Sequence, residues 1–262
     1  MKQAVLFFDI DGTLISDQTH IIPASTKEAL DRLVANGHIP VINTGRPYTH
    51  VVPPVKALPF RDYVCSCGMY IRQNGRVIQD AKPDLAVCRE MRDLVLDCGL
   101  DCFFEAKDVV YYRDGNFITL DPAHAGVNLE DGLYFSRDLD SPDFHFDKFG
   151  VWHTERSDYE RFAKGADRYF TRIIRDAHFT ELVLRGCSKG IGIRTFLESL
   201  PPADRTVFAV GDSMNDVEMF READISILMS SGTAELKDKV DYVTDGVDDD
   251  GVLHALEHFG LI

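Results

Sequence analysis

Three short runs of hydrophobic residues along the chain are each followed within two positions by a polar or acidic residue. They cover residues 4–8, 39–42 and 207–210. Every position in each run is apolar, a pattern typical of strands in a parallel sheet that is covered on both faces. The runs therefore predict the central strands of an α/β sheet.

Between and after these runs, the apolar positions follow helical spacing. A stripe over residues 29–34 predicts a helix, and Ser25 and Glu28 have the spacing of a capping box at its start. Gly37 is the residue type expected just past its end. Asn74-Gly75, between two short strand patterns, predicts a β-hairpin. Later patterns predict helices at 216–221, 234–239 and 252–259 and strands at 225–229 and 242–244.

The pattern changes in the middle of the chain, from residue 82 to residue 186. Helical patterns cover 85–96 and 158–170, and strand patterns cover 103–105, 109–112, 149–153 and 181–184. A stretch rich in Pro, Gly and Asp covers residues 121–143. We therefore expect an α/β core domain built from residues 1–81 and 187–262, with an α+β domain of residues 82–186 inserted into it.

The composition restricts the classes of function. The 262 residues carry 28 Lys and Arg against 43 Asp and Glu, a formal net charge of −15. A surface this acidic repels nucleic acid and anionic lipid, so we expect neither as a partner. No stretch approaches the roughly 20 apolar residues of a membrane span. The first apolar run is too short for a signal peptide and the six cysteines form no CxxC pair, so we expect a cytoplasmic protein with reduced thiols.

Polar side chains follow each of the three central strands. The residues are Asp9 and Asp11, then Thr44, then Asp212 and Asp216. Because ligands bind outside the carboxyl ends of the strands in open α/β sheets, we expect these residues to share one edge. Each group could instead be only a helix cap or a turn, where Asp and Thr are common. Oxygen ligands without Cys or His favour Mg²⁺.

Carboxylates beside Mg²⁺ suit phosphoryl transfer, because a carboxylate can attack phosphorus and form an aspartyl-phosphate. The reaction needs an acid for the leaving oxygen, which Asp11 could supply, and a fixed cation for the phosphoryl charge. Lys189, in a turn that enters a helix, is the candidate cation. Spacing alone does not distinguish it from a solvated lysine at a helix start.

Four segments form motifs that occur in order along the chain. They are Asp9-Ile10-Asp11-Gly12-Thr13-Leu14, Thr44-Gly45-Arg46, Ser188-Lys189-Gly190 and Gly211-Asp212-Ser213-Met214-Asn215-Asp216-Val217-Glu218-Met219. They resemble the four motifs of the haloacid dehalogenase superfamily of aspartate-nucleophile phosphohydrolases. The fourth motif and the tail from Tyr242 to Val252 resemble its Cof-type branch, which carries a cap between the second and third motifs. The resemblance implies a Rossmann-like parallel-sheet core with an inserted α+β cap.

The resemblance also implies a role for each matching residue. Asp9 is the expected nucleophile and a Mg²⁺ ligand, and Asp11 the general acid and base, with its backbone carbonyl on the metal. Asp212 is the further metal ligand, and Asp216 an acid close to the metal. The residues expected to bind the phosphoryl group are Thr44, Gly45, Lys189 and Asn215. Arg46 is expected to brace its loop by pairing with an acid.

The function that follows is Mg²⁺-dependent hydrolysis of small-molecule phosphate esters, sugar phosphates first. Cys67 and Ser231 stand where the branch usually has asparagine, so its substrate preference does not transfer to this chain. Glu105, Trp152 and His153 are candidate substrate contacts in the insert, and for each the alternative is a place in its core or on its surface. The sequence leaves the oligomeric state open, with a monomer or a weak dimer expected.

Three other functions remain open on the sequence. A phosphomutase with a similar core and cap would return the phosphoryl group to a sugar. A non-catalytic phospho-acceptor, like a receiver domain, would hold a stable acyl-phosphate, but such domains lack the second aspartate and the cap. A nucleotide-binding module is disfavoured, because no GxxxxGK[ST] and no complete GxGxxG follows a strand.

Overall fold

The chain divides into two compact units. The computed structural model describes residues 2–107, 109–112, 136–137 and 139–262, so most of the Pro/Gly/Asp-rich stretch lies outside the described residues. The core unit consists of Met1–Arg46, Val51–Asp80 and Ser188–Ile262, and the inserted unit of Pro47–His50 and Ala81–Cys187. None of the helices in the described ranges is long and apolar enough to cross a membrane.

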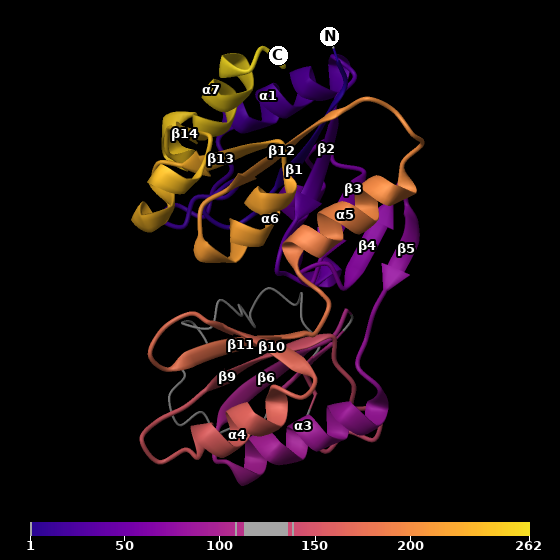
Figure 1. The fold of residues 1–262 in the computed structure, drawn as a ribbon, viewed down its shortest axis with the longest axis vertical. Coiled ribbons are helices and arrows are strands. Elements are labelled where there is room, and N and C mark those ends of the chain that lie inside the picture. The colour runs from indigo at the N-terminus through magenta and orange to yellow at the C-terminus, as the bar shows by residue number, and fades with distance from the viewer. Residues whose placement is uncertain (1, 108, 113–135, 138) are drawn as a thin grey trace. The chain divides into compact units, whose positions relative to one another are not determined.

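The core unit is an α/β domain (Figure 1). Its strands are β1 (Ala4–Phe8), β2 (Ile39–Asn43), β3 (Asp62–Cys65), β4 (Tyr70–Gln73), β5 (Arg76–Asp80), β12 (Thr206–Gly211), β13 (Ile225–Met229) and β14 (Tyr242–Thr244). Its α-helices are α1 (Ala24–Ala35), α2 (Pro53–Lys56), α5 (Lys189–Ser199), α6 (Val217–Glu222) and α7 (Gly251–His258). Short 3₁₀ segments cover Met214–Asp216, Ala234–Lys239 and Val247–Asp249.

The core strands form one sheet in the order β14-β13-β12-β1-β2-β3-β4-β5. The strands from β14 to β3 run parallel, and β4 and β5 add an antiparallel hairpin at one edge. The hairpin turn is Asn74-Gly75, whose φ angles of 46° and 80° suit these residue types. The predicted hairpin and the three predicted central strands, now β1, β2 and β12, are confirmed.

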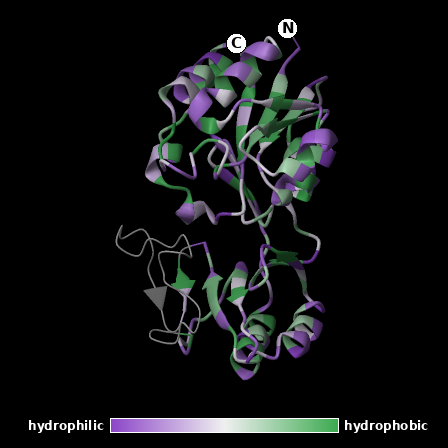
Figure 2. Ribbon diagram, turned by 90° about the vertical axis from the view of Figure 1, so that its left-hand side faces the viewer, coloured by the Kyte–Doolittle hydropathy of each residue, from purple (hydrophilic) through white to green (hydrophobic). Residues whose placement is uncertain are grey.

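Helices cover both faces of the core sheet, and hydrophobic residues concentrate on the strands (Figures 1 and 2). On one face Val5 and Phe7 of β1 pack with Ile193 of α5 and Met219 of α6. The helices α1 and α7 contact each other on the opposite face. Burial of β1 on both faces explains why its sequence is apolar at every position.

The inserted unit is an α+β domain. Its strands are β6 (Asp101–Glu105), β7 (Val110–Tyr111), β8 (Ser136–Arg137), β9 (Lys148–Trp152), β10 (Phe170–Ile174) and β11 (Phe179–Leu184). Its helices are α3 (Leu85–Asp97) and α4 (Tyr159–Ala166), with a 3₁₀ turn at Tyr48–His50. The sheet order is β10-β11-β9-β6-β7-β8, antiparallel except between β7 and β8.

Two local predictions are wrong. Ser25 caps no helix: α1 begins after Pro23, and Ser25 Oγ donates to Asp250 Oδ1 at 2.5 Å. The helical pattern at 158–170 contains the shorter helix α4 and then the first residue of β10, because Phe170 pairs with Leu184 of the neighbouring strand. The helix predicted at 234–239 is confirmed and is a 3₁₀ helix.

Candidate active site

The carboxyl ends of three neighbouring parallel strands form the centre of the site. β1 lies between β12 and β2, with Phe8 in register with both Val210 and Ile42. Asp9 follows β1 directly, and its N–H donates to the carbonyl oxygen of Val210 at 3.0 Å. The parallel register therefore brings the ends of β1, β2 and β12 to one edge, as the sequence predicts.

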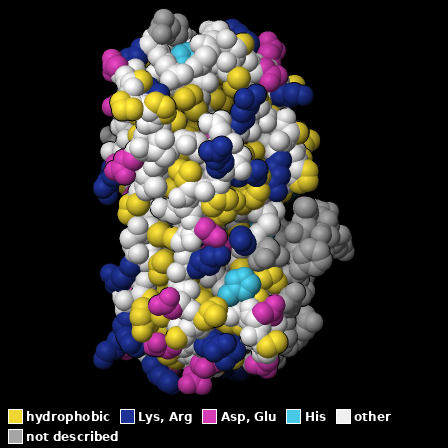
Figure 3. Space-filling model, turned by 90° about the vertical axis from the view of Figure 1, so that its right-hand side faces the viewer, with side chains coloured by type: hydrophobic (Ala, Val, Ile, Leu, Met, Phe, Trp, Pro, Cys, Tyr) yellow, Lys and Arg dark blue, Asp and Glu magenta, His cyan; other side chains and the backbone are white. Residues whose placement is uncertain are grey.

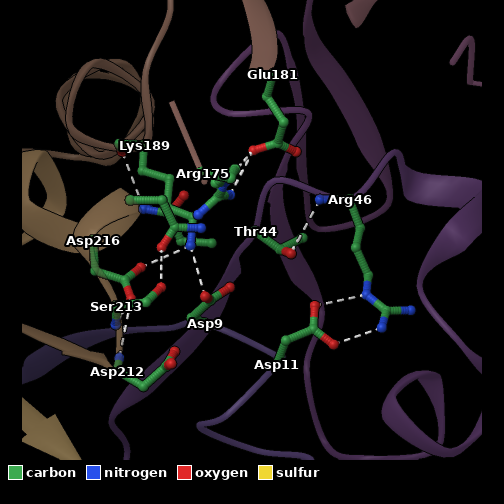
Figure 4. Close-up of polar contacts among 12 residues, drawn as sticks. Asp9, Asp11, Thr44, Arg46, Arg175, Glu181, Lys189, Asp212, Ser213 and Asp216 are labelled. Atoms are coloured by element: carbon green, nitrogen blue, oxygen red, sulfur yellow. Dashed lines mark hydrogen bonds and ion pairs between the residues drawn. The ribbon is translucent and has the colours of Figure 1, made fainter. Parts of the chain in front are cut away.

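Lys189 lies at the centre of the polar contacts in this site (Figure 4). It is the first residue of α5, and its side chain is almost completely buried. Its Nζ lies 2.8 Å from Asp9 Oδ2 and 2.7 Å from Asp216 Oδ1. Burial alone would lower the pKa of Lys189, but the carboxylates of Asp216 and Asp9 raise it above the ordinary value. The alternative of a solvated lysine is therefore wrong.

Two backbone anchors place this lysine. Ser188, the N-cap residue of α5, accepts a hydrogen bond from the N–H of Ile191 at 3.1 Å through its hydroxyl. Asn43 Nδ2, at the end of β2, donates to the backbone carbonyl oxygen of Lys189 at 3.0 Å. The sequence reasoning missed Asn43, although its place directly before Thr44 at a strand end was a signal for it.

Asp216 is completely buried and organises the loop after β12. Its Oδ2 accepts hydrogen bonds from the N–H of Asp212 at 3.0 Å and of Ser213 at 3.1 Å, while its Oδ1 binds Lys189. Ser213 Oγ donates to Asn215 Oδ1 at 2.6 Å, so the amide of Asn215 is fixed on the same loop. Both oxygens of Asp216 thus have partners, and its charge balances that of Lys189.

Three carboxylates gather around one point. Asp9, Asp212 and Asp216 each offer an oxygen atom, and these atoms lie within 4.8 Å of one another. Asp9 Oδ1 and Asp212 Oδ1 are buried, and neither has a hydrogen-bond partner in the described part of the chain. Two buried carboxylate oxygens without partners fit a bound cation, and an all-oxygen donor set fits Mg²⁺.

The electrostatics of the site reflect the crowding of these acids. Burial raises the pKa of Asp9 to about 7, an effect that Lys189 reduces and Asp216 and Asp11 increase. Burial and the charges of Asp216 and Asp9 raise the pKa of Asp212 to about 8. A divalent cation would favour the ionised form of both carboxyl groups and so offset the free-energy cost of burying their charges close together.

Gly12 permits the close approach of the first and fourth motifs. Its φ is +69°, in the left-handed region, and a Cβ added there would lie 2.6 Å from the carboxylate of Asp212. Any other residue at this position would displace Asp212 and strain the turn.

Asp11 points away from the buried carboxylates and toward Arg46 (Figure 4). Arg46 Nε donates to Asp11 Oδ2 at 2.8 Å, and the Arg46 terminal nitrogen donates to Oδ1 at 2.5 Å. The Asp11 side chain is 47% exposed, unlike that of Asp9. The predicted pairing of Arg46 with an acid is thus observed, and the sequence had not identified Asp11 as the partner.

Thr44 and Gly45 form the adjacent turn after β2. Thr44 is buried, and its Oγ1 accepts a hydrogen bond from the N–H of Arg46 at 3.1 Å. The backbone carbonyl oxygen of Thr44 accepts from the N–H of Cys67 at 3.1 Å. Cys67 is therefore buried beside the second motif and contributes to its backbone geometry.

The comparisons with known proteins agree with this arrangement. A family model of haloacid dehalogenase-like hydrolases matches residues 6–256. The sugar phosphatase BT4131, of HAD subclass IIB, has a solved structure that is similar to this chain with a TM-score of 0.80 and 25% identity, covering 99% of this chain and 100% of that one.

Two curated relatives cover the whole chain but differ in their own length. The 5-amino-6-(5-phospho-D-ribitylamino)uracil phosphatase YcsE of Bacillus subtilis is 22% identical over 98% of this chain and 96% of its own. A Streptococcus pyogenes protein is 27% identical over 100% of this chain, which spans only 55% of that longer protein.

Proposed function

The chain belongs to the haloacid dehalogenase-like hydrolases and is a phosphatase, and from this we propose that it hydrolyses small-molecule phosphomonoesters through an aspartyl-phosphate on Asp9. The observation that carries the proposal is the state of the Asp9 carboxylate. Its Oδ2 lies 2.8 Å from the ammonium of Lys189, and its Oδ1 is buried with no partner among the described residues. One oxygen is thereby oriented and the other can attack phosphorus.

In the first step, Asp9 Oδ1 forms a bond to phosphorus while the bond from phosphorus to the leaving oxygen breaks. Asp11 gives its proton to that oxygen, so the alcohol leaves neutral. In the second step, Asp11 takes a proton from a water molecule, whose oxygen attacks phosphorus and breaks the bond to Asp9. Phosphate and the free carboxylate of Asp9 result, and Asp11 has regained its proton.

The remaining residues bind and neutralise the phosphoryl group in this proposal. Lys189 supplies a fixed positive charge in a buried setting, where it acts more strongly than in water. The phosphoryl oxygens bind Thr44, Gly45 and Asn215 in addition to Lys189. Arg46 orients the carboxyl group of Asp11 through two hydrogen bonds.

We propose that Asp9, Asp212 and the backbone carbonyl of Asp11 hold Mg²⁺. When bound, the ion neutralises charge that develops on the transferring phosphoryl group. The buried Oδ1 of Asp212, which has no partner among the described residues, supports this set. Asp216 acts as the charge partner of Lys189, because both of its oxygens already accept hydrogen bonds.

We further propose that residues 1–81 and 187–262 carry the chemistry, and that residues 82–186 act as a cap that selects the substrate. Sugar phosphates are the proposed substrate class, supported by the similarity to a sugar phosphatase. Lys and Arg side chains are interspersed with Asp and Glu on the face drawn in Figure 3, which supports a small substrate over nucleic acid.

Phosphate release from a panel of phosphorylated metabolites and phenyl phosphate tests the proposal. Asp9→Asn should abolish release, Asp11→Asn should slow it, and Asp31→Asn, at an exposed position of α1, should leave it unchanged. Removal of divalent metal with EDTA should stop the reaction and Mg²⁺ should restore it. Full activity of Asp9→Asn would refute the mechanism, and ³¹P NMR of the products separates hydrolysis from transfer within a sugar.

A further inference from the structure

A buried amide side chain stands on an otherwise apolar face of the core sheet. In β2, Ile39 and Val41 belong to the face that packs against the hydrophobic residues of α5 and α6. Because side chains alternate along a strand, Asn43 points to the same face. Asn43 is completely buried. An apolar residue is the ordinary choice at such a position, so the amide requires an explanation.

Hydrogen bonds satisfy only one end of the Asn43 amide. Its Nδ2 donates to the backbone carbonyl oxygen of Lys189 at 3.0 Å. Since a carbonyl oxygen can only accept, the nitrogen of the amide must face it, and the amide oxygen points elsewhere. That oxygen, Oδ1, is buried and has no partner in the part of the chain that the structure describes. A buried acceptor without a partner lowers stability, and an apolar side chain would avoid this cost.

The bond from Asn43 to Lys189 joins a rigid segment to one that needs support. Asn43 ends a strand that has a neighbour on each side, β1 and β3, and it is in register with Val64 of β3. Lys189, in contrast, follows Cys187, the last residue of the inserted unit, by only two positions. A displacement of this connecting chain would act directly on Lys189 unless its backbone were fixed to the core sheet. Asn43 supplies such a fixed point.

The backbone position of Lys189 determines what its ammonium group can reach. Nζ lies 2.8 Å from Asp9 Oδ2 and 2.7 Å from Asp216 Oδ1. Asp216 in turn accepts hydrogen bonds from the N–H groups of Asp212 and Ser213, so the lysine also supports the loop of the fourth motif. Both ammonium contacts are short, and a misplacement of about 1 Å can slow an enzyme about 100-fold.

Asn43 also connects the lysine to the second motif, because it directly precedes Thr44. The N–H of Thr44 donates to the carbonyl oxygen of Val64 at 2.9 Å, so the backbone remains paired with β3 beyond the end of β2. One rigid strand end thus places a proposed phosphoryl-binding threonine through its backbone and the lysine through a side chain. Groups held on strands keep their geometry better than groups held on loops.

We infer that Asn43 is a positioning residue, whose amide holds the backbone of Lys189 so that the ammonium group stays between Asp9 and Asp216 during phosphoryl transfer. The inference rests on the proposed function, because it concerns the geometry that this reaction requires of its fixed cation. Asn43 itself takes no part in either chemical step.

Three variants separate positioning from a contribution to stability. Asn43→Val suits a strand and removes the amide oxygen that lacks a partner, but it has no donor for Lys189. Asn43→Ala removes the amide and leaves a cavity. Asn36→Ala is the matched control, because Asn36 at the end of α1 makes the same kind of bond, from Nδ2 to the backbone carbonyl oxygen of Leu261 at 2.9 Å.

Phosphate release from phenyl phosphate in saturating Mg²⁺, together with urea unfolding, tests the inference. Both Asn43 variants should lower kcat roughly 10- to 100-fold and change KM less than about threefold, because the other phosphoryl-binding residues remain. Asn36→Ala should keep kcat within about twofold of the wild-type value. The urea midpoint of Asn43→Val should stay close to that of the wild type, whereas that of Asn43→Ala should fall. If Asn43 were merely structural, activity would follow the urea midpoint instead.

The NMR signal of the Lys189 ammonium group gives a readout that does not depend on activity. Protons of a buried ammonium group exchange slowly with water, and the signal is assigned by its loss in Lys189→Met. The signal should shift or broaden beyond detection in Asn43→Val and stay in place in Asn36→Ala.

An unchanged kcat of Asn43→Val would overturn the inference, and so would a lowered kcat with an unchanged ammonium signal. Failure of Asn43→Val to fold would also contradict it, because folding would then need the amide. Absence of phosphate release by the wild-type protein contradicts the proposed function instead. The ammonium signals then still decide whether Asn43 positions Lys189.

Discussion

Replacement of the proposed nucleophile should make the metal-free protein more stable at alkaline pH. Burial raises the pKa of Asp9 to about 7, from an ordinary value of 3.8. A carboxyl group whose pKa is raised in the folded state is harder to ionise there than in the unfolded chain. Its ionisation therefore disfavours folding. The resulting cost to folding is absent below pH 3.8, grows as the pH rises, and is complete above about pH 7. Asp9→Asn removes the charge and therefore the cost.

The size of the effect follows from the pKa difference. At about 1.4 kcal/mol per pKa unit, the ionised Asp9 costs about 4 kcal/mol of folding free energy at pH 8. At pH 5 only the unfolded state is ionised, and the cost is about 2 kcal/mol. The gain in stability of Asp9→Asn should therefore rise between two- and threefold from pH 5 to pH 8.

Urea unfolding in EDTA at several pH values between 5 and 8 measures this difference directly. Asp31→Asn is the control, since it removes a carboxylate from an exposed position of α1. Mg²⁺ should stabilise the wild-type protein by about 3 kcal/mol at 100 times its dissociation constant, and should stabilise Asp9→Asn less. A stability gain that does not grow with pH, or a loss of stability at pH 8, would refute the electrostatic account of the site.

Three further predictions concern single residues. Gly12→Ala adds a Cβ that would lie 2.6 Å from the Asp212 carboxylate, so the Mg²⁺ concentration for half-maximal activity should rise, as a metal titration of phosphate release would show. Burial would raise the pKa of Glu181 in β11, but its lysine and arginine partners lower it from 4.5 to about 2, so its charge stabilises the fold above pH 4.5 and this contribution is lost as the pH falls through about 2. Glu181→Gln should cost about 3 kcal/mol in urea unfolding at pH 7 and progressively less toward pH 2. Of the six cysteines only Cys187 is not buried, so a thiol reagent should modify at most one cysteine in the native protein and all six after unfolding.

The position of the site at this edge of the sheet was predictable, because it follows from a local pattern of apolar and polar residues. Three apolar runs specify three buried strands, and the residues that follow them are polar. Once β12, β1 and β2 are neighbours and parallel, Asp212, Asp9 and Thr44 must lie at the same edge. The prediction also requires these three strands to be neighbours in the sheet, and the sequence supports this only through the four motifs.

The burial of Lys189 was not predictable from spacing, because it depends on a contact between distant segments. Its helix starts against the turn after β3, where a Cβ on Gly68 would lie 2.4 Å from the carbonyl oxygen of Ser188. In that turn Ser66, Cys67 and Gly68 all have positive φ angles. Left-handed Ser and Cys are rare, so no propensity rule indicates such a turn.

The inserted unit shows a different limit of sequence reasoning. Residues 158–170 have helical spacing, yet the helix ends at Ala166 and Phe170 starts a strand. The competing interaction is the pairing of β10 with β11, with Phe170 opposite Leu184. Strand pairing between segments decides such cases, and it overrides local propensity.

The neighbouring positions of β1 and β12 have a consequence for biosynthesis. Asp9 is translated about 180 residues before Lys189 and about 200 before Asp212, so the nucleophile exists long before its cation and its metal partner. At roughly 5–20 residues per second, this interval lasts about 10–40 seconds. The edge of β1 that pairs with β12 therefore stays unpaired until the last third of the chain has been synthesised. Catalytic competence of this protein is thus acquired late, and phosphate release by a nascent chain would report the completion of its core.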